Sequence, residues 1–183
     1  MKINTLLSNI YNYDTKKRSI RNIRAIALHF TANNGDSSLN NAKYFHNNIV
    51  GASAHFFVDR EGVIYRSVHI NRTAWAVESK GMKLKGIWNN ANTISIELCD
   101  FYKNKEISDA QMKALKYLIK KIQRNVYLHM GHKLELIRHY DVCGKACPIN
   151  LVDEKKWAEF KKEVLKWYQL KKELLEQIFQ ILQ

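Results

Sequence analysis

The stretch "NIRAIALHF", residues 22–30, decides the fold, because its alternating pattern predicts a β-strand that ends at a histidine. Its large apolar side chains would share one face of the strand, and its alanines would share the other face with His29. Small residues beside a histidine leave space for a ligand. The strand therefore predicts both a buried sheet and a cleft at one end of it.

Three further segments extend this sheet. "NTISIELCD" (92–100) alternates strictly, so Glu97 would project from the face opposite the isoleucines. "SAHFFVDREGVIYRS" (53–67) predicts a hairpin that turns around Arg60, Glu61 and Gly62. "LELIRHY" (134–140) predicts a short strand.

Helices are expected between and after these strands. "SSLNNAKYFHNN" (37–48) suits a short helix capped by a serine. Residues 108–129 have an amphipathic stripe, with Ser108 and Gln111 at the spacing of a capping box. Together the elements predict an α/β or α+β domain with a mixed central sheet flanked by helices.

Residues 1–165 are expected to form one domain, large enough for its own core and for a catalytic site. A long C-terminal helix is expected to follow, and its last part, residues 166–183, would extend beyond this domain. Leu174, Ile178 and Ile181 continue an apolar pattern beyond what a small domain needs. This second half of the helix could form a homodimer, begin a further module, or fold back on the body.

The charge balance favours a polyanionic partner, since 30 basic residues face 17 acidic ones and the net charge is +13. Nucleic acid, an anionic membrane, an acidic cell wall and a merely solvated basic surface all fit this charge. No base-reading or phosphate-cradling motif supports nucleic acid. No apolar run approaches the roughly 20 residues of a membrane span, so membrane insertion is not expected.

The N-terminal segment "MKINTLLSNIYNYDTKKR" lacks the order of a signal peptide, because its basic cluster follows a short, interrupted apolar stretch. We therefore expect synthesis in the cytoplasm without a signal peptide. The three cysteines, an odd number, argue against a disulfide framework.

The segment "RHYDVCGKACPIN" (138–150) carries the chemistry-bearing residues of the late chain. His139 and Cys147 bracket a loop of a length that can bring both onto one ion. With His29 they would make a two-histidine, one-cysteine set, which suits a hydrolytic zinc with one open position. Packed side chains, or a redox or helical pair of Cys143 and Cys147, remain alternatives at this point.

Four segments in order, "IALHFTANNG", "SAHFFVDREGVIY", "NTISIELC" and "IRHYDVCGKACP", resemble the zinc-dependent type 2 N-acetylmuramoyl-L-alanine amidases. This family includes phage endolysins, bacterial autolysins and peptidoglycan-recognition proteins, and the resemblance covers roughly residues 20–165. It implies the family's mixed sheet with a Zn²⁺ cleft on one side. It also implies that His29, His139 and Cys147 are the metal ligands and that Cys143 is incidental.

The resemblance assigns further roles around the metal. Glu97 matches the general base of one branch of the family, and Lys145 matches its transition-state lysine. We interpret His55 as a wall of the cleft or as a residue that supports the ligands from behind, not as a fourth ligand, and both His55 and Trp75 are candidates for substrate binding. Ala76 stands where many relatives carry a histidine, which puts the details of transition-state contact in doubt.

The implied activity is hydrolysis of the amide between N-acetylmuramic acid and the L-alanine of the peptidoglycan stem peptide. The positive charge fits a Gram-positive wall with anionic polymers, and the missing signal peptide fits an endolysin that reaches the wall after release at lysis. The alternative is a non-catalytic recognition protein that binds peptidoglycan. Such proteins typically lack the cysteine ligand, and Cys147 is present.

Overall fold

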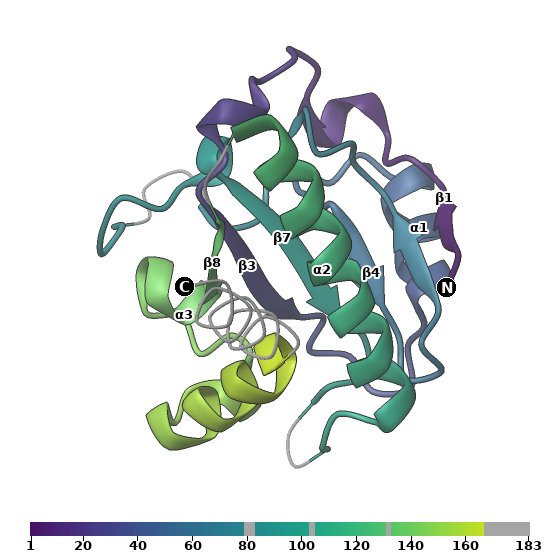
Figure 1. Ribbon diagram of the computed structural model, residues 1–183. Helices are drawn as coiled ribbons and strands as arrows, with labels where there is room; N and C mark the ends of the chain where they lie inside the picture. The colour runs from purple at the N-terminus through teal and green to yellow at the C-terminus, as the bar shows by residue number, and fades with distance from the viewer. Residues whose placement is uncertain (79–82, 103–104, 131–132, 167–183) are drawn as a thin grey trace, which may run out of the picture.

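The computed structural model describes residues 1–78, 83–102, 105–130 and 133–166. A six-stranded mixed sheet in the order β1-β5-β4-β7-β3-β8 forms its centre, and helices flank it (Figure 1), so the predicted fold class is confirmed. A separate two-stranded sheet joins β2 and β6. The strands are β1 (Ile3–Thr5), β2 (Tyr13–Asp14), β3 (Ala25–Phe30), β4 (Phe56–Val58), β5 (Ile64–Arg66), β6 (Thr73–Ala74), β7 (Thr93–Leu98) and β8 (Glu135–Arg138).

The middle of the sheet is parallel. Strand β7 pairs in parallel with β3 and β4, and β8 pairs in parallel with the other edge of β3. The predicted hairpin is present as the antiparallel pair β4–β5, and β1 extends the sheet by pairing in parallel with β5. The carboxyl ends of β7, β3 and β8 therefore lie at one edge of the sheet.

The helices also follow the sequence pattern. Helix α1 begins as expected, because the Ser37 hydroxyl accepts a hydrogen bond from the Asn40 amide at 3.2 Å. A further helix occupies residues 154–166. The named helices are α1 (Ser38–Asn47), α2 (Asp109–Met130) and α3 (His139–Cys143), and single 3₁₀ turns occupy Ile10–Asn12, Ile20–Asn22, Asn90–Asn92 and Ile149–Leu151.

The main core lies between the sheet and α2, which lies over the central strands in Figure 1. The large side chains of β3, β4 and β7 face α2 there, as their alternation predicts. Helix 154–166 closes the same core with Trp157, Phe160 and Val164. The residues proposed for dimerisation, Leu174, Ile178 and Ile181, lie outside the described residues.

The opposite face of the sheet is lined by smaller side chains. Ala25 and Ala27 pack there with Val77, Ile137 and Val142 in a second, smaller cluster. His29 shares this face with the alanines and is 2% exposed, and the ligand cleft expected beside it stays a prediction.

Two local expectations changed in the structure. The strand predicted over 134–140 ends at Arg138, because the Asp141 carboxylate accepts the Arg138 backbone N–H at 2.8 Å and starts α3. Ser108 does cap α2 by accepting the Gln111 amide at 3.1 Å, but the Gln111 side chain does not complete a capping box. It turns into the core and donates to the carbonyls of Val58 and Cys99.

A buried carboxylate ties α1 to the hairpin. Asp59 is 3% exposed, and its oxygens accept hydrogen bonds from the Ser38 amide, the Ser38 hydroxyl and the Val63 amide at 3.1, 2.6 and 2.8 Å. Hydrogen bonds to a charged acceptor are stronger than neutral ones. The carboxylate also lies at the N-terminus of α1, where the helix dipole favours negative charge.

We therefore predict that Asp59→Ala lowers the free energy of unfolding by about 3 kcal/mol, because it strands several buried donors. Urea denaturation at neutral pH measures this change. Glu61→Ala removes the same charge from the exposed turn of the same hairpin and should change stability by less than about 0.5 kcal/mol. Equal effects of the two substitutions would contradict the assigned role of Asp59.

Candidate metal centre

Three adjacent strand ends bring the predicted residues together. His29 on β3 and Glu97 on β7 are Cα partners in the sheet, so their side chains project from the same face. On the other side of β3, Leu28 pairs with Arg138, and His139 follows directly. The parallel register thus places Glu97, His29 and His139 in one row at the carboxyl edge.

The loop after α3 adds Cys147 to this row. Gly144 ends α3 in the left-handed conformation, with φ of 81°, which reverses the chain. The Tyr140 amide then donates to the Cys147 carbonyl at 2.9 Å and fixes the loop against α3. As a result the Cys147 sulfur lies 3.9 Å from Nδ1 of His29.

His29, His139 and Cys147 form a buried cluster with the geometry of a metal site. One ligand atom from each lies within 4.8 Å of the others, and the two imidazole centroids are 4.6 Å apart. Nitrogen and sulfur ligands bound tetrahedrally to one zinc ion are separated by roughly 3.5 Å. A small inward movement of these side chains would therefore bring their ligand atoms to the distances needed to bind one cation.

The protonation of the histidines suits a metal. Burial, and next the charge of Lys145, lower the pKa of His139 to about 4. Burial also lowers the pKa of His29 well below its usual value, so both rings are neutral. Nε2 of His139 donates to the Val77 carbonyl at 3.2 Å, and its buried Nδ1 has no hydrogen-bond partner among the described residues. That carbonyl fixes the tautomer that leaves Nδ1 open to an ion.

The chemistry of Cys147 agrees. Burial, and secondly the Glu97 carboxylate, raise the pKa of its thiol to about 12, so the thiol holds its proton when no cation is near. A bound divalent ion deprotonates such a thiol and gains a thiolate ligand. Cys143 is half-buried, and its sulfur lies 3.8 Å from the His139 carbonyl oxygen, outside the three-residue cluster.

Glu97 lies at the side of the cluster. Its Oε1 is 3.9 Å from Nδ1 of His29, and its buried Oε2 has no hydrogen-bond partner within the described residues. Burial raises the pKa of Glu97 to about 8, the Lys145 charge opposes this rise, and the Asp36 carboxylate adds to it. Asp36 was not identified from the sequence. It comes close because its own carboxylate accepts the Asp100 amide beyond the end of β7.

Lys145 and Trp75, which were also predicted from the sequence, lie outside the three-residue cluster. Lys145 is exposed, and its charge acts on Glu97 and on both histidines, which places it near the cluster. Trp75 is half-buried and bonded through its backbone to Ser53. Its role as a substrate-binding residue stays a prediction.

His55 lies in the interior instead of on an accessible wall. It is 0% exposed, its Nδ1 accepts the Ser95 amide at 3.0 Å, and its Nε2 donates to the Arg72 carbonyl at 3.1 Å. The Arg18 guanidinium also contacts the ring, at 2.9 Å. In this arrangement His55 braces β7 against the segment around Arg72 and presents no free atom to a substrate.

A positioning group missed by the sequence analysis sits beneath His139. The Arg138 side chain is 3% exposed and donates to Asp141, to Glu154 and to the Leu151 carbonyl, while its guanidinium lies 5.2 Å from the Trp157 ring. It joins β8, α3 and helix 154–166. The strand-end histidine is thereby held in a rigid frame.

The comparisons with known proteins agree with this geometry. Residues 19–150 match the N-acetylmuramoyl-L-alanine amidase family. The chain is 29% identical over 167 residues to N-acetylmuramoyl-L-alanine amidase CwlL of Bacillus licheniformis, covering 85% of this chain and 44% of that protein. It is 31% identical over 137 residues to N-acetylmuramoyl-L-alanine amidase CwlA of Bacillus subtilis, covering 74% and 47%. The chain thus spans about half the length of these relatives.

Solved structures share the fold. The catalytic domain of XlyA superposes with a TM-score of 0.69 at 22% identity, covering 90% of this chain and 99% of that one. The PlyG catalytic domain gives a TM-score of 0.67 at 21% identity, covering 91% and 94%. Both matches include nearly all of the compared domain, so the likeness extends over the whole of that fold.

The left-handed turn that delivers Cys147 can be tested directly. Gly144→Ala should lower the free energy of unfolding by about 1–2 kcal/mol, because a Cβ is strained at this φ and would also meet the Lys85 side chain. Gly86→Ala is the matched control, since Gly86 has no positive φ and no atom within 4 Å of a new Cβ. Urea titration measures the free energy of unfolding of both variants, and equal values for the two would contradict the prediction.

Proposed function

Because the chain belongs to the N-acetylmuramoyl-L-alanine amidase family, we propose that it is a zinc-dependent peptidoglycan hydrolase. The bond cleaved would be the amide between N-acetylmuramic acid and the L-alanine of the stem peptide. One observation carries the proposal: the buried His29–His139–Cys147 cluster lies directly beside Glu97, whose Oε1 is 3.9 Å from Nδ1 of His29 and whose buried Oε2 has no hydrogen-bond partner in the described part of the chain. A recognition protein without catalysis would need neither the thiol nor the carboxylate there.

The three clustered side chains would hold the zinc ion. They provide two neutral imidazoles and one thiol, a set that leaves a fourth tetrahedral position open. When bound, zinc supplies Lewis-acid activation of water and of the amide carbonyl. The Val77 carbonyl keeps His139 in the required tautomer throughout.

Glu97 would act as the general base and then as the general acid. A bound cation would lower the raised pKa of Glu97 again, because a nearby positive charge favours the ionised carboxylate. The carboxylate would then take a proton from the water that attacks the carbonyl carbon and return this proton to the alanine nitrogen as the C–N bond breaks. The products are a lactyl carboxylate on the sugar and a free N-terminal amine. The Lys145 ammonium would stabilise the oxyanion that develops on the carbonyl oxygen, and Trp75 would line the cleft.

The cell wall is the proposed place of action. None of the helices in the described part of the chain is long and apolar enough to cross a bilayer. The net charge of +13 favours a wall with anionic polymers. We propose that the protein is an endolysin that reaches a Gram-positive wall after release at lysis, with residues 1–165 as its catalytic domain and 166–183 as an extension able to pair in a homodimer.

The activity is tested by digesting purified Gram-positive walls and labelling newly exposed amino groups, with and without a chelator. The expected result is new N-terminal alanine that disappears with chelator. New reducing sugars would overturn the proposal in favour of a glycosidase. Binding to the wall without any new ends would identify a recognition protein instead.

Zinc retention depends on the assigned ligands. Purified wild-type protein should retain about one zinc per chain, and His139→Ala or Cys147→Ala should lose it, because two ligands bind the ion far more weakly than three. Metal content after dialysis, measured by mass spectrometry, checks this. Cys143→Ala is the matched control and should keep both zinc and activity. Retention of zinc by Cys147→Ala would rule out the thiolate as a ligand.

The role of Glu97 separates catalysis from metal binding. Glu97→Gln should reduce kcat by about 100-fold or more, because the amide cannot shuttle the proton, while zinc content stays at the wild-type level. Rates on a soluble muramoyl peptide, together with metal analysis, provide both readouts. Full activity of this variant would remove Glu97 from the mechanism.

A further inference from the structure

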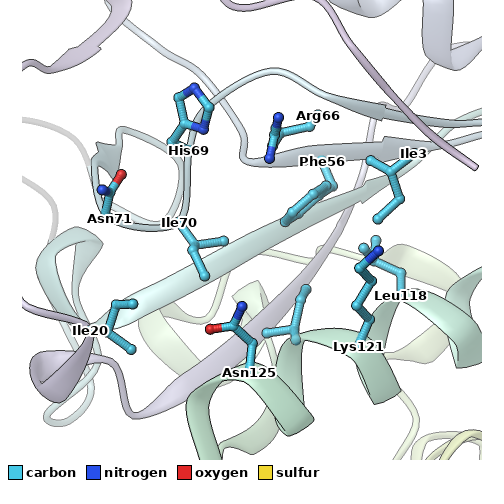
Figure 2. A pocket seen from close by; sticks show the side chains of 11 residues that line it. Ile3, Ile20, Phe56, Arg66, His69, Ile70, Asn71, Leu118, Lys121 and Asn125 are labelled. Atoms are coloured by element: carbon cyan, nitrogen blue, oxygen red, sulfur yellow. The ribbon is translucent and has the colours of Figure 1, made fainter. Parts of the chain in front are cut away.

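A second concave site lies on the sheet face opposite the metal centre. Figure 2 shows this trough, a pocket of about 500 Å³ between the edge of the sheet and α2. Strand β5 and the loop after it form one wall, and one stripe of α2 forms the other. Neither the metal cluster nor Glu97 lines it.

The floor of the trough is apolar. Phe56 and Leu118 are 4% and 0% exposed, and the half-buried Ile70 packs against them in the main core. On α2, residues 118, 121, 122 and 125 recur at helical spacing, so one face of the helix supplies the whole wall. The apolar side chains therefore lie recessed, below the polar ends of their neighbours.

Each wall carries one cation. Arg66 stands on the strand side and Lys121 on the helix side in Figure 2, and no acidic residue lines the trough. One terminal nitrogen of Arg66 donates to the Thr5 hydroxyl at 3.0 Å, while its buried Nε has no hydrogen-bond partner among the described residues. Lys121 contacts the Tyr117 side chain, and no ion pair joins Lys121 or Arg66 to a carboxylate within residues 1–78, 83–102, 105–130 and 133–166.

Polar groups between the cations are uncharged. Asn71 and Asn125 contribute amides to opposite walls. Burial, and then the charges of Arg66 and Arg72, lower the pKa of His69, so its imidazole is neutral at neutral pH. The trough thus combines two separated positive charges, neutral hydrogen-bonding groups and an apolar floor.

We propose that this trough binds a segment of an anionic polyol-phosphate polymer of the bacterial wall. Its phosphates would pair with Arg66 and Lys121, and the carbon units between them would lie on the floor around Ile70. The choice of a wall polymer as the source of these phosphates rests on the proposed function. The inference that the trough binds phosphate groups follows from its own side chains and does not depend on that function.

The shape favours a single chain over a membrane surface. A bilayer presents its headgroups as a broad plane, which cannot reach the buried Phe56 and Leu118 at the floor. A single flexible chain can enter between β5 and α2. Because the trough and the metal centre lie on opposite faces of one sheet, a bound polymer would leave the catalytic cleft open.

The test measures binding of purified poly(glycerol phosphate) to the full chain by titration calorimetry in the presence of a chelator. In Arg66→Gln/Lys121→Gln the dissociation constant should rise at least about tenfold, because two charge-assisted contacts are lost. Lys113→Gln/Arg124→Gln removes the same two charges from the exposed surface of α2 and should change it by less than about twofold. Equal losses in both pairs would overturn the site.

A second pair of variants leaves Arg66 unchanged, in case substitution of this half-buried side chain prevents folding. Lys121 and Lys113 are both exposed on α2, so Lys121→Glu and Lys113→Glu should both fold. Only Lys121→Glu should weaken polymer binding, again about tenfold. Indistinguishable binding of these two variants would contradict the proposal.

Two further ligands identify the source of the phosphate. Inorganic phosphate should compete weakly, since it cannot contact both walls. Vesicles of phosphatidylglycerol should not be bound through Lys121. Preferred binding to vesicles, lost in Lys121→Glu, would replace the polymer with a membrane and overturn the proposal.

Failure of this proposal and of the amidase are distinguishable. The trough variants should cleave a soluble muramoyl peptide at the wild-type rate, because they lie on the other face of the sheet. Loss of amidase activity in Glu97→Gln should leave polymer binding unchanged. If the protein binds the polymer but never cleaves peptidoglycan, the amidase proposal is wrong and the proposed polymer-binding trough is still supported.

Discussion

The parallel register of β7, β3 and β8 is the constraint on which the site depends. It sets His29 opposite Glu97 and places Arg138 beside Leu28, so the next residue, His139, emerges next to His29. A shift by one residue would turn each side chain to the other face and bury the imidazoles in the α2 core. The register is itself held by the isoleucines and leucines that pack under α2, so the core enforces the geometry of the chemistry.

Local periodicity explains how much of the fold could be read from the sequence. The alternation in 22–30 and 92–100, the hairpin around 60–62 and the stripe of α2 each depend on neighbours within one element, and all were predicted correctly. The parallel pairing of β1 with β5 was not foreseen, because it joins short segments far apart in the chain. The end of β8 was missed because the Asp141 side chain, not an apolar pattern, ends the strand.

The residues of the site likewise fall into those that could be predicted from the sequence and those that could not. Their chemical type made His29, His139 and Cys147 candidates, the resemblance to the amidase family singled them out as ligands, and the structure brings them together. The groups that tune them carry no such signal. The group that accepts the His139 hydrogen bond is the Val77 backbone carbonyl, which any residue possesses, and Asp36 approaches Glu97 only through the folding of a loop. Arg138 reads as one more basic residue until its buried network is seen.

The alternation of the strands also gives the two faces of the sheet different chemistry. On one face, small side chains pack beside the buried imidazoles and thiol, which converge at the carboxyl edge. On the other, large side chains fill the space under α2, and the trough remains only where the sheet edge and the helix diverge. Lys145 is the cation beside the metal cluster, whereas Arg66 and Lys121 belong to the other face of the sheet. If both proposals hold, the sheet would act as a spacer, so that one small domain could bind a polyanion on one face and hydrolyse a neutral amide on the other.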